Sequence, residues 1–133
     1  MPVGVLVGPV IPGLTNAEIP AILAAAREAG AGSAGYTLLR LPLTGAPVFV
    51  EWLEREQPGR AGRVLAQIRR AREGRLNDSD FATRMAGTGA MAGQIAGLFR
   101  LCARRLGLDG RLPALDSSRF TPPTPRSGQM RLF

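Results

Sequence analysis

The first part of the chain combines continuous apolar runs with segments of helical periodicity. Residues 3–11 (VGVLVGPVI) and 34–41 (AGYTLLRL) are apolar at nearly every position and are followed by proline or glycine. Such runs are typical of strands that are covered on both faces of a parallel sheet. We therefore expect two strands that are each buried on both sides.

Each predicted strand is followed by a predicted helix. Thr15 and Glu18 have the spacing of a capping box, with Thr15 as the N-cap. The helix behind them repeats apolar residues every three or four positions, at Ile19, Ile22, Leu23 and Ala26. A second helix is expected from about Pro47 to Gln57. Its buried stripe is expected to be Val48, Trp52 and Leu53. This order predicts parallel pairing with a right-handed crossover.

Two buried parallel strands cannot form a complete sheet by themselves. They would leave open edges, which natural proteins avoid, and too few neighbours to cover their apolar faces. Either a partner subunit supplies the missing strands or they precede this chain. The first apolar run begins close to Met1, which favours the second explanation.

The second half of the chain is predicted to be helical and then extended. Residues 59–73 form an amphipathic segment, and Gly74 is expected to end it. Residues 75–90 are expected to form a loop. A further helix over residues 90–106 has clean core periodicity at Met91, Ile95, Leu98, Phe99, Cys102 and Leu106. Gly107 is its expected C-cap. We divide the chain into residues 1–57, a helical extension at 58–110, and a Pro-rich tail at 111–133.

The charge of the chain is strongly positive and comes from arginine alone. All 17 basic residues are arginine, and the net charge is +7. Positive charge of this size favours contact with polyanions such as DNA, but it serves equally well to keep a protein in solution. Arg60, Arg63 and Arg70 on the helix after Pro58 are the candidate DNA contacts. A solvated helix face is the alternative explanation for them.

The composition excludes several kinds of chemistry within this chain. Histidine is absent and Cys102 is the only cysteine, so neither a Ser-His-Asp triad nor a Cys/His metal site can be assembled. Cys102 is expected to be a buried small apolar residue. A single cysteine, no recognisable export leader and no run long enough to cross a bilayer lead us to expect a cytoplasmic protein without membrane contact.

Several segments resemble one family. Residues 4–43 (GVLVGPVIPGLTNAEIPAILAAAREAGAGSAGYTLLRLPL) resemble the last part of a radical S-adenosylmethionine (SAM) barrel. The similarity is to the group of spore photoproduct lyase and the DNA-repair-photolyase-like proteins. LNDSDFATRMAGTG at 76–89, FRLCARRLGL at 99–108 and LDSSRF at 115–120 are similar to the C-terminal region of this group. The resemblance covers nearly the whole chain.

The resemblance implies the last two β/α units of a partial (β/α)6 radical SAM barrel, followed by a helical C-terminal extension. In the full-length family the barrel binds SAM and a 4Fe-4S cluster. The residues that it assigns to the adenosine part of SAM are Gly8, Val10, Ile11 and Tyr36. The family holds its cluster with a C-x3-C-x2-C loop, which this chain lacks. We therefore expect the chain alone to bind no cluster and to be inactive without an N-terminal barrel part that carries the three cysteines.

The end of the chain carries a second signal. Residues 129–133 (QMRLF) resemble the pentapeptide that binds the bacterial β sliding clamp. Met130, Leu132 and Phe133 would enter an apolar pocket, and the amide of Gln129 would set the register. Folding of these side chains back onto the protein's own core is the alternative. The sequence thus supports three hypotheses: part of a radical SAM enzyme, a non-enzymatic module that binds DNA and the clamp, or a gene fragment with a misplaced start codon.

Overall fold

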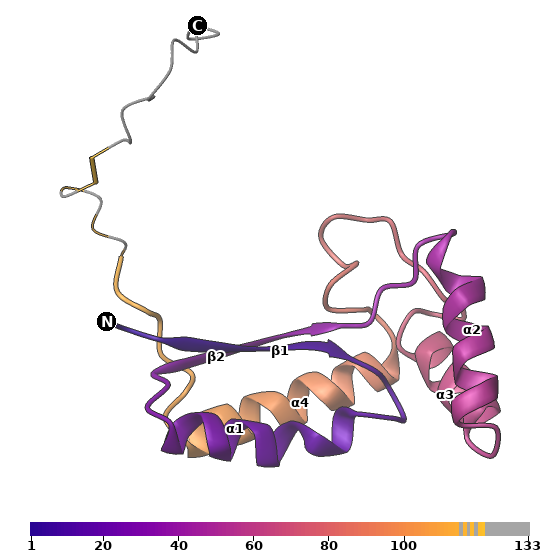
Figure 1. Ribbon diagram of the computed structural model, residues 1–133, viewed down its shortest axis with the longest axis horizontal. Coiled ribbons are helices and arrows are strands. Elements are labelled where there is room, and N and C mark those ends of the chain that lie inside the picture. The colour runs from indigo at the N-terminus through magenta and orange to yellow at the C-terminus, as the bar shows by residue number, and fades with distance from the viewer. Residues whose placement is uncertain (115, 117, 119, 122–133) are drawn as a thin grey trace, which may run out of the picture.

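The structure is a computed structural model that describes residues 1–114, 116, 118, 120 and 121. This part of the chain is a small mixed α/β domain with two parallel strands and four α-helices (Figure 1). The expected α/β class and the parallel pair are confirmed. In chain order the elements are β1 Gly4–Val10, the 3-10 helix η1 Asn16–Glu18, α1 Ile19–Glu28, β2 Ser33–Leu38, α2 Gly45–Glu56, α3 Ala61–Arg70 and α4 Ala90–Arg105.

The sheet consists of β1 and β2 alone among the described residues. The register pairs Gly4 with Ser33 and Val7 with Tyr36, and it shifts before Val10. Pro9 lies at this shift, where a residue without an N–H group is tolerated. Backbone carbonyls of Met85 and Leu108 accept hydrogen bonds from the outer edge of β2, at 2.8 Å each. No strand in the described part of the chain lies beside the outer edge of β1.

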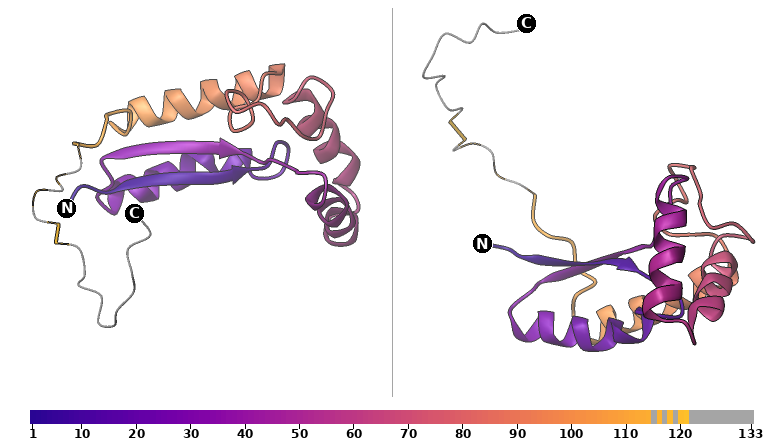
Figure 2. Two further views of the ribbon diagram at one scale, coloured as in Figure 1. Left: turned by 90° about the horizontal axis from the view of Figure 1, so that it is seen from above. Right: turned by 45° about the vertical axis from the view of Figure 1, so that its right-hand side comes forward.

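Both α1 and α4 cover the same face of this sheet (Figures 1 and 2). The main core fills the space between them and the strands. It is built chiefly from Val7, Val10, Ile19, Leu23, Leu38, Ile95 and Phe99. The helix predicted at 90–106 is therefore confirmed, with Gly107 at a φ of 65° after its end. Cys102 is partly buried against this core.

The other face of the sheet is largely bare: no described helix or strand covers it, and Leu112 approaches it beside Gly4. Within the described chain, the expectation of strands buried on both sides is therefore wrong. Leu6 points away from the helices and is 68% exposed. Because side chains alternate along a strand, the residues on its side of the sheet are Gly4 and Gly8 in β1 and Ser33, Gly35 and Thr37 in β2. No described helix lies over this face.

A smaller core joins α2 to α3. Its buried members are Leu41, Leu53, Ala61, Val64 and Ile68. The prediction for α2 is right for Leu53 and wrong for Val48, which is 67% exposed, and for Trp52, which stands at the surface. The helix packs on α3 through Leu53, and this contact turns its second apolar stripe outward.

The start of α1 also differs from the prediction. The capping box does not form, because the Thr15 hydroxyl accepts a hydrogen bond from the backbone N–H of Ile11 at 2.9 Å. Asn16 likewise accepts from the N–H of Gly13 at 2.7 Å. These bonds order the loop after β1, and α1 itself begins at Ile19 with Pro20 in its first turn.

Within the described part of the chain, no helix combines the length and apolarity needed to cross a bilayer.

Candidate functional site

The carboxyl ends of β1 and β2 meet at one edge of the sheet, next to α2 and α3 (Figure 1). The loops after both strands begin there, and the loop that joins α3 to α4 reaches the same region through the bond from Leu38 N–H to the Met85 carbonyl. Ligands of open α/β sheets bind at this edge. These three loops therefore form the candidate site.

A cleft of about 870 Å³ lies beside this edge, between α2 and the end of α3. Its lining is mainly apolar, from Leu41, Leu43, Ala46, Pro47, Val50 and Leu76. Glu51 and Glu54 of α2 supply acidic groups, whereas Arg69 and Arg75 supply basic ones. A lining of this kind suits the binding of an amphipathic group and carries no nucleophile–base pair.

A buried arginine ties the α3–α4 loop to the end of β2. Arg72 is only 2% exposed. Its Nη2 donates to the carbonyl of Leu39 at 2.7 Å and to that of Arg84 at 2.8 Å. Burial lowers the pKa of this guanidinium, and Asp78 partly offsets the effect. Two charge-assisted bonds to loop carbonyls hold the base of the loop in place.

The tip of the same loop is built by two aspartates. Asp78 accepts hydrogen bonds from the Thr83 hydroxyl at 2.5 Å and from the backbone N–H of Asp80 at 2.9 Å. The Thr83 bond, followed by the Asp80 bond, lowers the pKa of the Asp78 carboxyl. Asp80 in turn accepts from the N–H of Ala82 at 2.7 Å. Local bonds of this type fix the backbone of turns.

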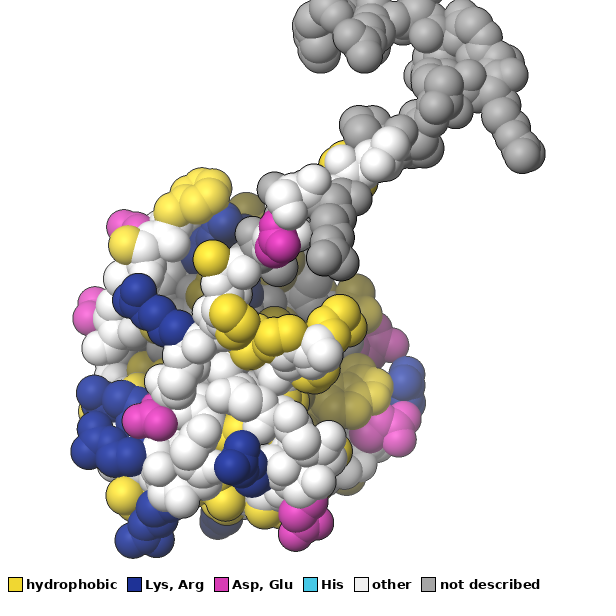
Figure 3. Space-filling view, turned by 90° about the vertical axis from the view of Figure 1, so that its left-hand side faces the viewer, with side chains coloured by type: hydrophobic (Ala, Val, Ile, Leu, Met, Phe, Trp, Pro, Cys, Tyr) yellow, Lys and Arg dark blue, Asp and Glu magenta, His cyan; other side chains and the backbone are white. Residues whose placement is uncertain are grey.

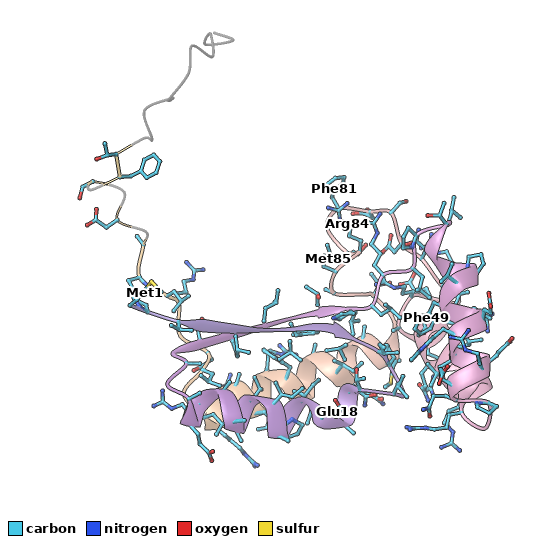
Figure 4. All side chains as sticks on the ribbon, in the orientation of Figure 1. Met1, Glu18, Phe49, Phe81, Arg84 and Met85 are labelled. Atoms are coloured by element: carbon cyan, nitrogen blue, oxygen red, sulfur yellow. The ribbon has the colours of Figure 1, made fainter. Side chains whose placement is uncertain are left out.

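This turn presents one aromatic ring to solvent. Phe81 is 82% exposed, and the guanidinium of Arg84 lies over its ring at 3.7 Å from the centroid. Figure 4 shows Phe81, Arg84 and Met85 together on the side of the sheet away from α1 and α4. Phe81, Arg84 and Met85 were not singled out from the sequence. The turn-forming cluster Asn77-Asp78-Ser79-Asp80 before Phe81 is the sequence signal that could have drawn attention to them.

Two glycines, Gly87 and Gly89, lie where the loop leads into α4. The N–H groups of Thr88 and Gly89 both donate to the carbonyl of Ala71 at 3.2 Å. A Cβ on Gly89 would overlap the Arg70 carbonyl, and one on Gly87 would lie 2.6 Å from the Ala71 oxygen. The Gly-x-Gly pattern before α4 is thus required by the close passage of the loop past the end of α3.

The four residues that the resemblance assigns to SAM do not line one cavity. Gly8 lies on the bare face of the sheet, whereas Val10 and Tyr36 face the helices. The Tyr36 ring packs on Phe99 with centroids 4.7 Å apart, and burial raises the pKa of its hydroxyl. Ile11 packs against the smaller core between α2 and α3.

The candidate DNA contacts are at the surface of α3. Arg63 and Arg70 are exposed and lie seven positions apart, about two turns, so they share one side of the helix. Arg60 precedes the helix and donates to the Gly13 carbonyl at 3.3 Å. Basic side chains also gather on one flank of the end where the chain begins (Figure 3), so they are not confined to α3. Gln129, Met130, Leu132 and Phe133 lie outside the described residues.

A 4Fe-4S cluster does not fit the donor groups of this chain. The chain has one cysteine and no histidine. Among the residues that the structure describes, no group of three or more His, Cys, Asp or Glu side chains is placed to hold a metal. Three thiolate ligands would have to come from another polypeptide segment.

Comparison with known proteins adds no assignment. No protein-family model matches the chain, and neither the curated proteins nor the solved structures contain a match.

Proposed function

We propose that this chain is the C-terminal segment of a radical SAM iron–sulfur enzyme similar to DNA repair lyases. It would supply the last part of the wall of a (β/α)6 barrel and would be inactive without the part that carries the three cysteines. The observation that supports this most is the one-sided sheet. The two helices that cover the strands, α1 and α4, lie on the same face, and no described helix covers the other face.

A barrel explains this arrangement physically. In (β/α) barrels the helices surround the sheet, and the inward side chains pack against those of other strands. The bare face here is made of small residues around Leu6, and it is already crowded where the strands are close. A Cβ on Gly8 would lie 2.6 Å from the Thr37 hydroxyl. Small residues allow other backbone or side chains to approach closely.

The unpaired edge of β1 supports the same proposal. A two-stranded sheet needs further strands or packing against helices to be stable in water, and here α1 and α4 cover only one of its faces. Strands added beside β1 would pair its free N–H and C=O groups and would cover Leu6. In this arrangement Gly8 would face the barrel interior, near the edge where ligands of parallel sheets bind.

The test is complementation. The chain is co-expressed with a polypeptide that carries a C-x3-C-x2-C loop and four β/α units, encoded upstream or elsewhere in the genome. We expect a 1:1 complex that binds a 4Fe-4S cluster after anaerobic reconstitution. Leu6→Arg should abolish the complex without unfolding the isolated chain, because Leu6 is already exposed.

Val48→Arg is the matched control, because Val48 is as exposed as Leu6 but lies on α2. This variant should assemble normally. A stoichiometric cluster in the chain alone would contradict the proposal. Equal assembly by Leu6→Arg and Val48→Arg would contradict it as well.

A non-enzymatic module that binds DNA and the sliding clamp is the second candidate. The exposure of Arg63 and Arg70 on one side of α3 favours it. We expect duplex DNA binding that weakens steeply with salt, and a smaller salt slope in Arg63→Gln/Arg70→Gln. The clamp is tested by pull-down with the wild-type chain and with Gln129→Ala/Phe133→Ala. Equal capture of both would reject the clamp contact.

A further inference from the structure

The exposed pair of Phe81 and Arg84 has no role in either core. Neither residue belongs to the main core or to the core between α2 and α3. An aromatic side chain that is 82% exposed contributes little to folding, so the stability of the domain does not explain it. Arg84 covers one face of the ring, and the large exposure means that the opposite face is open.

The ring is held in position before any ligand arrives. Phe81 and Arg84 are three positions apart in a turn closed by the bond from Arg84 N–H to the Asp80 carbonyl, at 2.9 Å. Asp78 fixes the start of this turn through Thr83. Arg72 holds the carbonyl of Arg84 from the buried side. A side chain that is already positioned loses little conformational entropy on binding.

The pair stands on the side of the sheet where a ligand is accessible. In Figure 4 the loop extends away from α1 and α4, on the side of the bare face and near the carboxyl end of β2. Residues 74–77 of the same loop line the 870 Å³ cleft. The loop that carries the ring therefore also forms part of the wall of this cleft.

We propose that residues 78–85 form a stacking platform for a base of single-stranded nucleic acid. The open face of Phe81 stacks on the base, because every base presents a π surface. Arg84 supports the ring from behind and, with the exposed Arg75 at the cleft, supplies positive charge for the flanking phosphates. Glu73, Asp78 and Asp80 lie around Arg75 and oppose this charge, so the ring carries the larger share of the affinity.

This platform differs from the α3 surface and does not depend on the iron–sulfur proposal. Arg63 and Arg70 would contact phosphates of any duplex, because they carry charge without an aromatic partner. Stacking on Phe81 requires an unpaired base. A preference for single strands over duplexes of equal length therefore distinguishes the two surfaces.

Fluorescence anisotropy with a labelled twelve-nucleotide oligo(dT) tests the platform. Oligo(U) and the matching DNA duplex are the other arms, and the protein is the full chain. We expect the single strands to bind more tightly than the duplex. Phe81→Ala should weaken single-strand binding by roughly 5- to 100-fold, the usual effect of removing one stacked aromatic residue. Phe120→Ala, at another exposed phenylalanine, should leave it unchanged.

A spectroscopic variant detects stacking directly. In Trp52→Phe/Phe81→Trp the only tryptophan is at the platform, and a stacked base should quench its emission. Unaltered binding by Phe81→Ala, or an equal loss in Phe81→Ala and Phe120→Ala, would overturn the proposal. So would the absence of oligonucleotide binding by the wild-type chain, which would leave a protein partner as the reason for the exposed ring.

Discussion

The two faces of the β1–β2 sheet differ in almost every physical respect. One face places Val7, Val10 and Leu38 beneath α1 and α4, where they are buried. The opposite face has glycine, serine and threonine around an exposed Leu6; no described helix or strand covers it, and Leu112 approaches it only beside Gly4. Under our proposal, this chain supplies one half of a layered structure and another polypeptide segment supplies the other half. If so, substitutions on the two faces should affect different measurements.

Removing an aromatic side chain from the core between the covered face and its helices should have the largest effect. Phe99→Ala should lower the free energy of unfolding by about 3–5 kcal/mol, because it deletes a ring packed on Tyr36 within the core. Leu6→Ala on the bare face should change it by less than about 0.5 kcal/mol. Urea unfolding followed by circular dichroism measures both. Similar losses for the two variants would show that Leu6 is covered in solution.

The next largest effect is expected at the buried arginine. Arg72→Met should cost about 2–4 kcal/mol, because the Leu39 and Arg84 carbonyls lose charge-assisted bonds. It should also reduce binding at Phe81, since the loop is no longer held. Arg75→Met is the control for stability, because Arg75 belongs to the same loop but is exposed, and Arg72 makes the bonds to both carbonyls. Equal stability of the two variants would contradict the assigned role of Arg72.

A smaller, pH-dependent effect is expected from Asp78. The Thr83 and Asp80 hydrogen bonds depress the pKa of its carboxyl in the folded chain below the ordinary value of 3.8. A depressed pKa adds stability above the unfolded value, and this stability is lost as the pH falls through the folded one. Asp78→Asn should therefore be less stable than wild type at pH 6, and the difference should shrink below about pH 4. A difference that stays constant between pH 7 and pH 2.5 in urea unfolding would contradict this.

The smallest effect on the isolated chain is expected at Gly8. An added Cβ would crowd only the Thr37 hydroxyl, which is free to rotate because the face above it is bare. Gly8→Ala should thus change the melting temperature little. The same variant should weaken assembly with the cysteine-bearing part, where close approach is needed. A large loss of stability in the isolated chain would mean that the bare face is already occupied.

Local patterns in the sequence predicted where helices and strands form better than they predicted which of their side chains are buried. The periodicity of residues 90–106 predicted α4 and its core residues because a helix displays its buried stripe directly. The run at residues 3–11 predicted a strand but not its bare face, because Gly4 and Gly8 count as apolar whether covered or not. Helix α2 has two apolar stripes, and either could have been the buried one. Leu53 is buried and Val48 is not because α2 packs on α3 through Leu53.

The candidate site was less accessible to prediction because it depends on long-range contacts. Arg72 reaches Leu39 across 33 positions and Arg84 across 12. Neither spacing corresponds to a known motif. Because arginine is common in this chain, the sequence does not indicate which arginine is buried. A loop was expected at residues 75–90, but the exposure of Phe81 depends on how that loop folds in three dimensions, which no local pattern encodes.

Amide hydrogen exchange of β1 tests the central claim most directly. The exchange of residues 4–10 is compared in the chain alone and in a 1:1 mixture with the polypeptide that carries the C-x3-C-x2-C loop. The account predicts faster exchange in β1 than in α4 for the chain alone, and strong additional protection of β1 in the mixture, as its free edge pairs and its bare face is covered. Exchange in β1 that is slow from the start, or that the mixture leaves unchanged, would contradict the claim that another part completes this sheet.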